Sequence, residues 1–231
     1  SPPTRVAVRT LGLLPSFFAA LPPSPADALS GRPRTETVDL GSVDGYVRAH
    51  VYRPPSGRHP ALVITLGIDP APPDDPRVVR LLNGLASAGL VAVLIESDAL
   101  NNDELFPDLP AALVEGVQYV AQQPEVRADR VGLFGFSVGG SLALDAAADP
   151  RIRDRLRLVA AFGSFSDLRD AVLSVATHTL DDDGTVRSWE PDSAAEQHLG
   201  NALLAGLQDQ QEAALLRQRF VAGQNVAIDP T

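Results

Sequence analysis

The sequence predicts an α/β fold with a doubly wound, mostly parallel sheet, an N-terminal hairpin and a C-terminal helical segment that resembles a lid. Short apolar runs without polar alternation indicate strands that are buried on both faces. Helical stretches separate these runs, and parallel strands need such crossover connections. With 231 residues, 45% of them hydrophobic, the chain can bury one sizeable core. We therefore expect a single domain of mixed type.

The first segment, residues 1–34, is expected to precede the folded core. Residues 22–34 are rich in Pro, Ser and Gly and indicate a linker. The apolar run at residues 11–21 follows Arg5 and Arg9, an arrangement that loosely mimics a secretory signal. The alternative is an amphipathic helix broken at Pro15. A cytoplasmic location is favoured, and secretion stays open.

The core, expected over residues 35–170, opens with two alternating segments around Asp44-Gly45, which indicate an antiparallel hairpin. Apolar runs then alternate with helical stretches in the order that a parallel sheet requires. The expected hairpin strands are 35–40 and 46–52. The later expected strands are 61–66, 90–95, 130–134 and 156–162, with helices at 78–88, 109–122 and 137–148.

Beyond residue 162 the pattern becomes helical, with expected helices at 168–177, 192–206 and 208–222. No convincing strand is visible there, the best candidate being 220–228. We expect residues 171–231 to form a helical, lid-like insertion. The acidic stretch 181–184 is expected to be a solvated turn rather than a cation site. Trp189 is expected to pack within this segment, with substrate contact as the alternative.

Composition excludes several kinds of chemistry. The net charge of −10 argues against nucleic acid as a partner, because binding phosphates requires clustered basic residues. All 19 basic residues are Arg, and the chain has no Lys or Cys, which excludes a Schiff-base lysine and thiolate chemistry. No run approaches the roughly 20 apolar residues of a transmembrane helix. We expect no metal and no cofactor.

The main chemical signal is the pentapeptide Gly135-Phe136-Ser137-Val138-Gly139, which follows an expected strand and precedes an expected helix. A sharp strand-to-helix turn requires glycines two residues before and after the serine, because side chains there would collide. The turn exposes the serine hydroxyl, and the helix directs its positive end toward a developing oxyanion. The alternative is a glycine-rich capping turn of a phosphate-binding fold, although the motifs of those folds are absent.

These residues resemble the nucleophile elbow of the dienelactone hydrolase-like and prolyl oligopeptidase-like branch of the α/β-hydrolases. Residues 52–54 and 59–64 resemble the approach of that branch to its third strand. The likeness covers about residues 35–170. It implies a serine hydrolase that acts on a small-molecule carboxylic ester through an acyl-enzyme on Ser137. An acyltransferase and a noncatalytic binding protein are the alternatives.

The resemblance also implies an oxyanion hole made of two backbone amides, those of Ile68 and Val138. Gly67 would allow a close backbone approach, whereas Leu66 stands where such enzymes commonly have His. Because the donor is a main-chain group, this departure does not remove it. An ordinary glycine-containing loop at a strand end is the alternative.

The acid and base of a catalytic triad are not evident in the sequence. The implied chain order is serine, acid, histidine, and only His178 and His198 follow Ser137, both within the helical tail. Asp167 is a weak candidate for the acid, with a helix N-cap as the favoured role. We therefore expect a missing segment or a partner to complete the sheet and the triad. The 231-residue chain alone should then have little activity and a tendency to aggregate.

Overall fold

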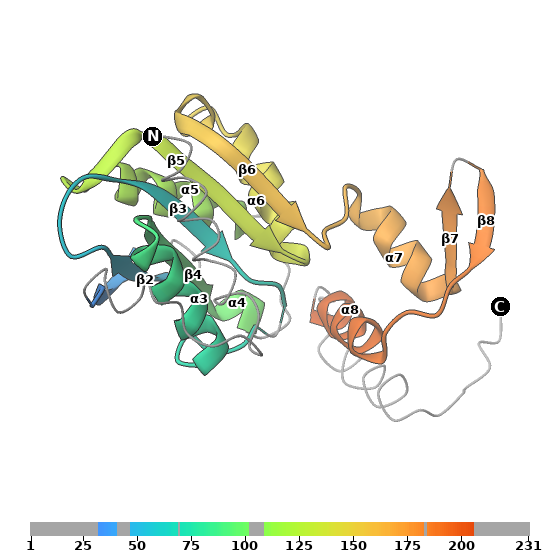
Figure 1. Cartoon of the computed structure of the whole chain (residues 1–231). Coiled ribbons are helices and arrows are strands. Elements are labelled where there is room, and N and C mark those ends of the chain that lie inside the picture. Colours follow the sequence, from blue (N-terminus) through green and yellow to red (C-terminus); the bar gives the residue numbers. More distant parts are fainter. Residues whose placement is uncertain (1–31, 41–46, 69, 102–108, 183, 206–231) are drawn as a thin grey trace.

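The computed structural model describes residues 32–40, 47–68, 70–101, 109–182 and 184–205, and it confirms the α/β fold. A six-stranded sheet has the order β1-β2-β4-β3-β5-β6, with helices on both faces (Figure 1). The strands from β3 to β6 are parallel, while β1 and β2 form the antiparallel end.

The hairpin consists of β1 (Arg34–Asp39) and β2 (Val47–Arg53). Their register runs from Arg34 opposite Arg53 to Asp39 opposite Arg48. Alternate β2 residues are buried, as the period of a strand requires. The hairpin prediction is confirmed, and its expected turn at Asp44-Gly45 lies outside the described residues.

The parallel part alternates strands with helices as the sequence predicts. The order is β3 (His59–Thr65), α3 (Pro76–Ser87), β4 (Val91–Ser97), α4 (Asp98–Asn101), α5 (Leu109–Ala121), β5 (Val126–Phe136), α6 (Val138–Ala148) and β6 (Leu156–Phe162). A short 3-10 helix, Arg153–Arg155, leads into β6. The one-turn helix α4 was not predicted, because four residues are too few to show a helical period.

Two apolar layers hold the sheet, one on each face. In β4, Val91, Val93 and Ile95 pack on the side of α5 and α6, whereas Ala92 and Leu94 pack on the side of α3 (Figure 1). Because both faces of β4 are covered, its sequence is a continuous apolar run.

Strand β6 is the exception to this pattern, although its sequence is also an apolar run. Among the described residues β6 is the edge of the sheet, and Leu158 and Phe162 are 54% and 70% exposed. No described element covers that part of the α3 face, so β6 leaves apolar surface exposed at an uncovered edge, as expected for a sheet without its later strands. A cavity of about 510 Å³ beside Leu62 and Leu158 marks the gap.

After β6 the chain forms α7 (Leu168–Thr177), the two-stranded sheet β7 (Thr179–Asp182) and β8 (Thr185–Ser188), and α8 (Ser193–Ala205). These elements lie beyond the carboxyl ends of the parallel strands (Figure 1). The helices predicted at 168–177 and 192–206 are present. The prediction that no strand follows residue 162 is wrong. Strands β7 and β8 are short, polar and largely exposed, so their sequences carry no apolar pattern.

The expected helix at 208–222 and the candidate strand at 220–228 lie outside the described residues, as does most of the expected segment 1–34. Where the chain is described, no helix combines the length and apolar character needed to cross a membrane.

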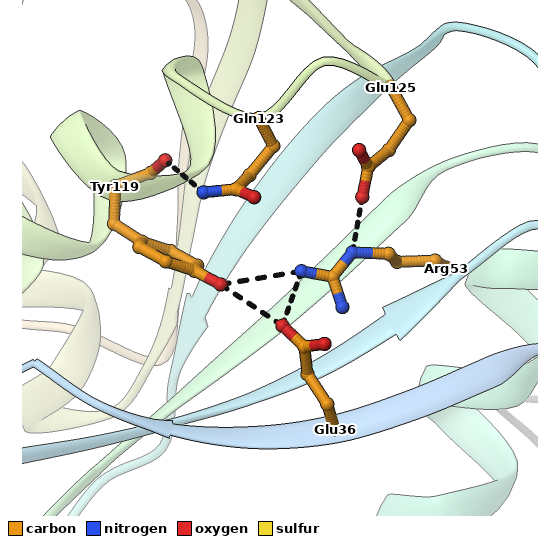
Figure 2. A network of polar contacts seen from close by, with 5 residues as sticks. All are labelled: Glu36, Arg53, Tyr119, Gln123 and Glu125. Carbon is orange, nitrogen blue, oxygen red and sulfur yellow. Dashed lines mark hydrogen bonds and ion pairs between the residues drawn. The ribbon is translucent and has the colours of Figure 1, made fainter.

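A buried arginine joins the hairpin to the rest of the core (Figure 2). The Arg53 side chain is only 7% exposed, and its guanidinium donates to Glu36 at 2.6 Å and to the Tyr119 hydroxyl at 3.3 Å. It also forms an ion pair with Glu125, just ahead of β5. The hydrogen bond from Arg53 holds the pKa of Glu36 below its usual value. Strands β1 and β2, helix α5 and the start of β5 therefore share one charged junction.

Candidate functional site

The turn between β5 and α6 holds Ser137 in a strained conformation. Its backbone has φ 52° and ψ −130°, in a region that non-glycine residues rarely adopt. The Ser137 amide donates to the Phe162 carbonyl at 2.8 Å, and the Gly140 amide donates to the Ser137 carbonyl at 2.9 Å. The end of β6 and the first turn of α6 therefore fix the serine from two sides.

Both elbow glycines are required by close backbone contacts. A β-carbon on Gly135 would lie 2.2 Å from the Gly139 carbonyl oxygen, and one on Gly139 would lie 2.2 Å from the Leu66 carbonyl oxygen. Real β-carbons essentially never approach backbone atoms this closely. There is therefore no room for a side chain at Gly135, where the strand enters the turn, or at Gly139, where the helix begins.

The loop after β3 lies against the serine. A β-carbon on Gly67 would stand 3.0 Å from the Ser137 β-carbon and 3.4 Å from its hydroxyl oxygen. Ile68, next in the chain, lines the same cavity as Ser137 and Val138. Val138 is the first residue of α6, and the first amides of a helix have no acceptor within the helix. The structure thus brings the two expected oxyanion residues to one cavity with the serine.

This cavity, which we call the Ser137 cavity, has a volume of about 570 Å³ and lies between the elbow and the segment after β6. Its volume falls in the range of small-molecule binding sites. The wall opposite the serine comes from α7, β7, α8 and the segment before α8. Its apolar lining includes Ile68, Val138, Val175, Leu180, Trp189 and Leu199.

Ser141 connects the elbow helix to the loop that leads to this wall. Its hydroxyl donates to the Phe165 carbonyl at 2.6 Å and accepts from the Phe165 amide at 3.2 Å. Ser141 is four residues after Ser137 and so lies one helical turn further along α6. The bond pair fixes residues 163–166, which line the Ser137 cavity. Sequence reasoning missed this role because nothing in the motif requires it.

The two histidines after Ser137 have different positions. His178 ends α7 in the left-handed conformation, and its Nε2 lies 2.8 Å from Glu196 Oε1. His198 lies on α8 and lines the Ser137 cavity. Only one of the two candidates is therefore brought to the cavity of the serine.

The earlier histidines bind within the sheet region. His59 contacts the carbonyls of Ser56 and Gly89. His50 is half-buried, and its Nε2 lies 2.8 Å from Glu96 Oε2 of β4. His50 is partly covered because β2 is an inner strand of the sheet.

The candidate acid has a structural partner. Asp167 is the N-cap of α7 and accepts from the Asp170 amide at 3.1 Å, although it also lines the Ser137 cavity. Asp181 accepts from the Gly184 amide at 2.7 Å and so forms part of the β7–β8 turn. Over the described ranges, no group of three or more His, Asp or Glu side chains could hold a metal ion.

Comparison with known proteins gives curated relatives that match about half of the chain. No family model matches. A Bradyrhizobium protein described as a probable 2-oxo-3-(5-oxofuran-2-ylidene)propanoate lactonase is 35% identical over 135 residues. The match covers 50% of this chain and 52% of that protein, so the chain spans about half the length of this relative.

Solved structures also resemble this one over most of the chain, among them two hydrolases. The 2,6-dihydroxy-pseudo-oxynicotine hydrolase has a TM-score of 0.56 at 19% identity, covering 81% of this chain and 49% of that one. Esterase Est22 has a TM-score of 0.51 at 19% identity, covering 71% of this chain and 52% of that one. At this identity the likeness shows a shared fold.

Proposed function

The chain has the α/β-hydrolase fold, and on that premise we propose that it carries the nucleophile of a serine hydrolase that acts on carboxylic esters or lactones. The observation that carries the proposal is Ser137 itself. It holds a positive φ at a strand-to-helix turn, beside the Gly67 loop and at the wall of a cavity. The named activities of the lactonase and esterase relatives support this substrate class.

In the proposed reaction the Ser137 hydroxyl oxygen attacks the carbonyl carbon of the ester. The carbonyl oxygen then acquires negative charge, which the amides of Ile68 and Val138 and the N-terminal end of α6 would stabilise. Collapse of this intermediate releases the alcohol and leaves an acyl group on Ser137. Water then attacks the acyl-enzyme, releasing the acid and restoring the serine.

A serine hydroxyl needs a base to take its proton. His178 lies beside Glu196 and does not line the Ser137 cavity, which argues against it. His198 lines the cavity but stands on a helix rather than after a strand of the main sheet. We therefore leave the base unassigned and treat His198 as the variant that tests whether this chain supplies it.

A noncatalytic binding protein is the second candidate. The observation that favours it is that His50, His59 and His178 contact partners away from Ser137, while Asp167 caps a helix. In that case the Ser137 cavity would bind a small apolar ligand without chemical change.

Hydrolysis of p-nitrophenyl butyrate separates the two candidates. We would compare the protein expressed from its complete gene, the 231-residue chain, and Ser137→Ala. A serine hydrolase should lose at least about 10³-fold in kcat/KM on Ser137→Ala, because the covalent route is lost. The matched control is Ser166→Ala, since Ser166 lines the same cavity. That variant should keep activity within a few-fold.

Turnover by the complete protein that survives Ser137→Ala would exclude the nucleophile. If none of these proteins turns over the ester or releases an initial burst of p-nitrophenol, the result would favour a binding protein. Turnover by the short chain that His198→Ala abolishes would assign His198 as the base.

A further inference from the structure

We infer that the Ser137 cavity selects ligands that are apolar and either neutral or cationic, and that it rejects anions. This inference deepens the proposed function by naming the charge class of the substrate, and so it rests on that function. It separates this chain from the lactonase relative, whose named substrate is a propanoate and therefore carries a carboxylate. Its observable basis is the charge and polarity of the cavity, which a binding measurement can test without any chemical step.

The first observation is the apolar wall that faces the serine. Val175 of α7, Leu199 of α8 and the Trp189 ring line the cavity together with Ile68 and Val138. A ligand anchored by its carbonyl at Ser137 would bury its hydrocarbon part against this wall. Burying apolar surface stabilises the bound state. Such a wall favours an alkyl or aryl group over a polar one.

The second observation is the sign of the charged groups on the cavity. Asp167 and Asp170 both line it, and no Arg is among its described lining residues. His198 is the one described lining residue that can carry positive charge. The nearest arginine along α7, Arg169, does not line the cavity, and Arg187 on β8 pairs with Asp182 at 2.5 Å. A carboxylate on the ligand would therefore meet like charge, without a guanidinium partner among the described lining residues.

The third observation is the charge of the whole segment that forms the wall. Residues 163–205 contain eight acidic residues and two arginines, a formal net charge of −6 out of −10 for the chain. Charges of one sign around a cleft raise the local concentration of the opposite ion and lower that of like ions. The negative charge of the segment around the Ser137 cavity thus disfavours anions, as does the charge of the residues that line the cavity.

Three probes that share one carbon skeleton and differ in net charge test the inference. The probes are 4-phenylbutanamide, 4-phenylbutanoate and 4-phenylbutylammonium, which share the phenylpropyl group. Trp189 is the only tryptophan of the chain and lines the cavity, so its fluorescence reports occupancy directly. Titrations at pH 8 and low ionic strength should give a Kd for the anion at least about tenfold weaker than for the amide. The ammonium should bind as tightly as the amide or more tightly.

A matched pair of variants tests which charge is responsible. Asp170→Asn should narrow the ratio of the anion Kd to the amide Kd by about two- to fivefold, an effect that salt should suppress. Asp154→Asn is the control, because Asp154 is 88% exposed and lies before β6, at the opposite end of that strand from the cavity. It removes the same charge and should leave the ratio unchanged.

The inference is overturned if the anion binds as tightly as the amide, or if no probe gives a saturable change in Trp189 emission. It is also overturned if Asp154→Asn changes the ratio as much as Asp170→Asn. None of these readouts requires a reactive serine. Failure of Ser137 to form an acyl-enzyme would therefore reject the proposed function and leave the charge preference of the cavity measurable.

Discussion

The carbonyl oxygen of Leu66 lies 2.2 Å from the point where a β-carbon on Gly139 would stand. The end of β3 therefore packs directly on the first turn of α6, with no room for a side chain between the two backbones. This contact brings the Gly67 loop beside Ser137 and so sets the geometry of the whole elbow.

Gly139→Ala should disrupt the elbow. One methyl group there meets backbone that cannot rotate away, so we expect a loss of about 2–4 kcal/mol in the free energy of unfolding. Urea denaturation followed by circular dichroism would measure it. The matched control is Gly200→Ala in α8, where a β-carbon meets nothing within 4 Å. Because alanine favours a helix, that variant should be unchanged or more stable by up to about 1 kcal/mol. Equal losses in both variants would contradict the packing described.

Arg53→Met should loosen the hairpin. Removing this buried cation leaves Glu36 and Glu125 without their shared partner, and we expect a cost of about 2–4 kcal/mol in unfolding free energy. Arg77→Met is the control, since Arg77 is 76% exposed and pairs with Asp75 at 2.8 Å. An exposed pair contributes about 0–1 kcal/mol. A smaller loss for Arg53→Met than for Arg77→Met would show that the buried junction does not stabilise the fold.

Glu36 should make stability depend on pH. Its pKa is lowered from 4.5, mainly by the hydrogen bond from Arg53, so the ionised form is favoured in the folded state. The resulting stability is fully present above about 4.5 and is lost as pH falls through the folded-state pKa. Wild type should therefore exceed Glu36→Gln in unfolding free energy at pH 7, and the difference should shrink in acid. The exposed Glu190 gives the control variant Glu190→Gln, and a pH-independent difference for Glu36→Gln would refute the linkage.

Ser141→Ala should free the loop that leads to the cavity wall. The Phe165 amide loses its acceptor, and the Phe165 carbonyl loses a donor at 2.6 Å. We expect faster hydrogen exchange at the Phe165 amide, with a loss of about 1 kcal/mol in unfolding free energy. Exchange at β4 amides provides the internal reference and should not change. Unaltered exchange at Phe165 would mean that other contacts hold the loop.

The core of the fold could be predicted from sequence because its strands are apolar on both faces and its helices have a clear period. Strands β3 and β4 and helices α3, α5 and α6 lie within two residues of the expected bounds. The β7–β8 hairpin could not be predicted, because its exposed strands have the composition of a loop. The exposed apolar surface of β6 was expected from the lack of a later strand in the sequence, although the apolar run of β6 alone does not reveal whether anything covers it.

The functional site, like the fold, could be predicted only in part. The elbow could be located because a glycine pattern at a strand-to-helix boundary is a local signal, and Ser137, Val138 and the Gly67 loop do lie together. The wall formed by α7, β7 and α8 depends on tertiary packing between segments far apart in the chain, which no local pattern encodes. The positions of His198 on the cavity and of His178 beside Glu196 also depend on tertiary packing, and so they could not be predicted.

Covalent labelling by a fluorophosphonate tests the central claim most directly. The protein from the complete gene would be labelled, digested and mapped by mass spectrometry, beside Ser137→Ala and Ser166→Ala. A nucleophilic Ser137 predicts one phosphonyl group on the peptide that contains it, complete loss of labelling in Ser137→Ala, and full labelling in Ser166→Ala. Undiminished labelling of Ser137→Ala, or a label mapped to another residue, would contradict the account.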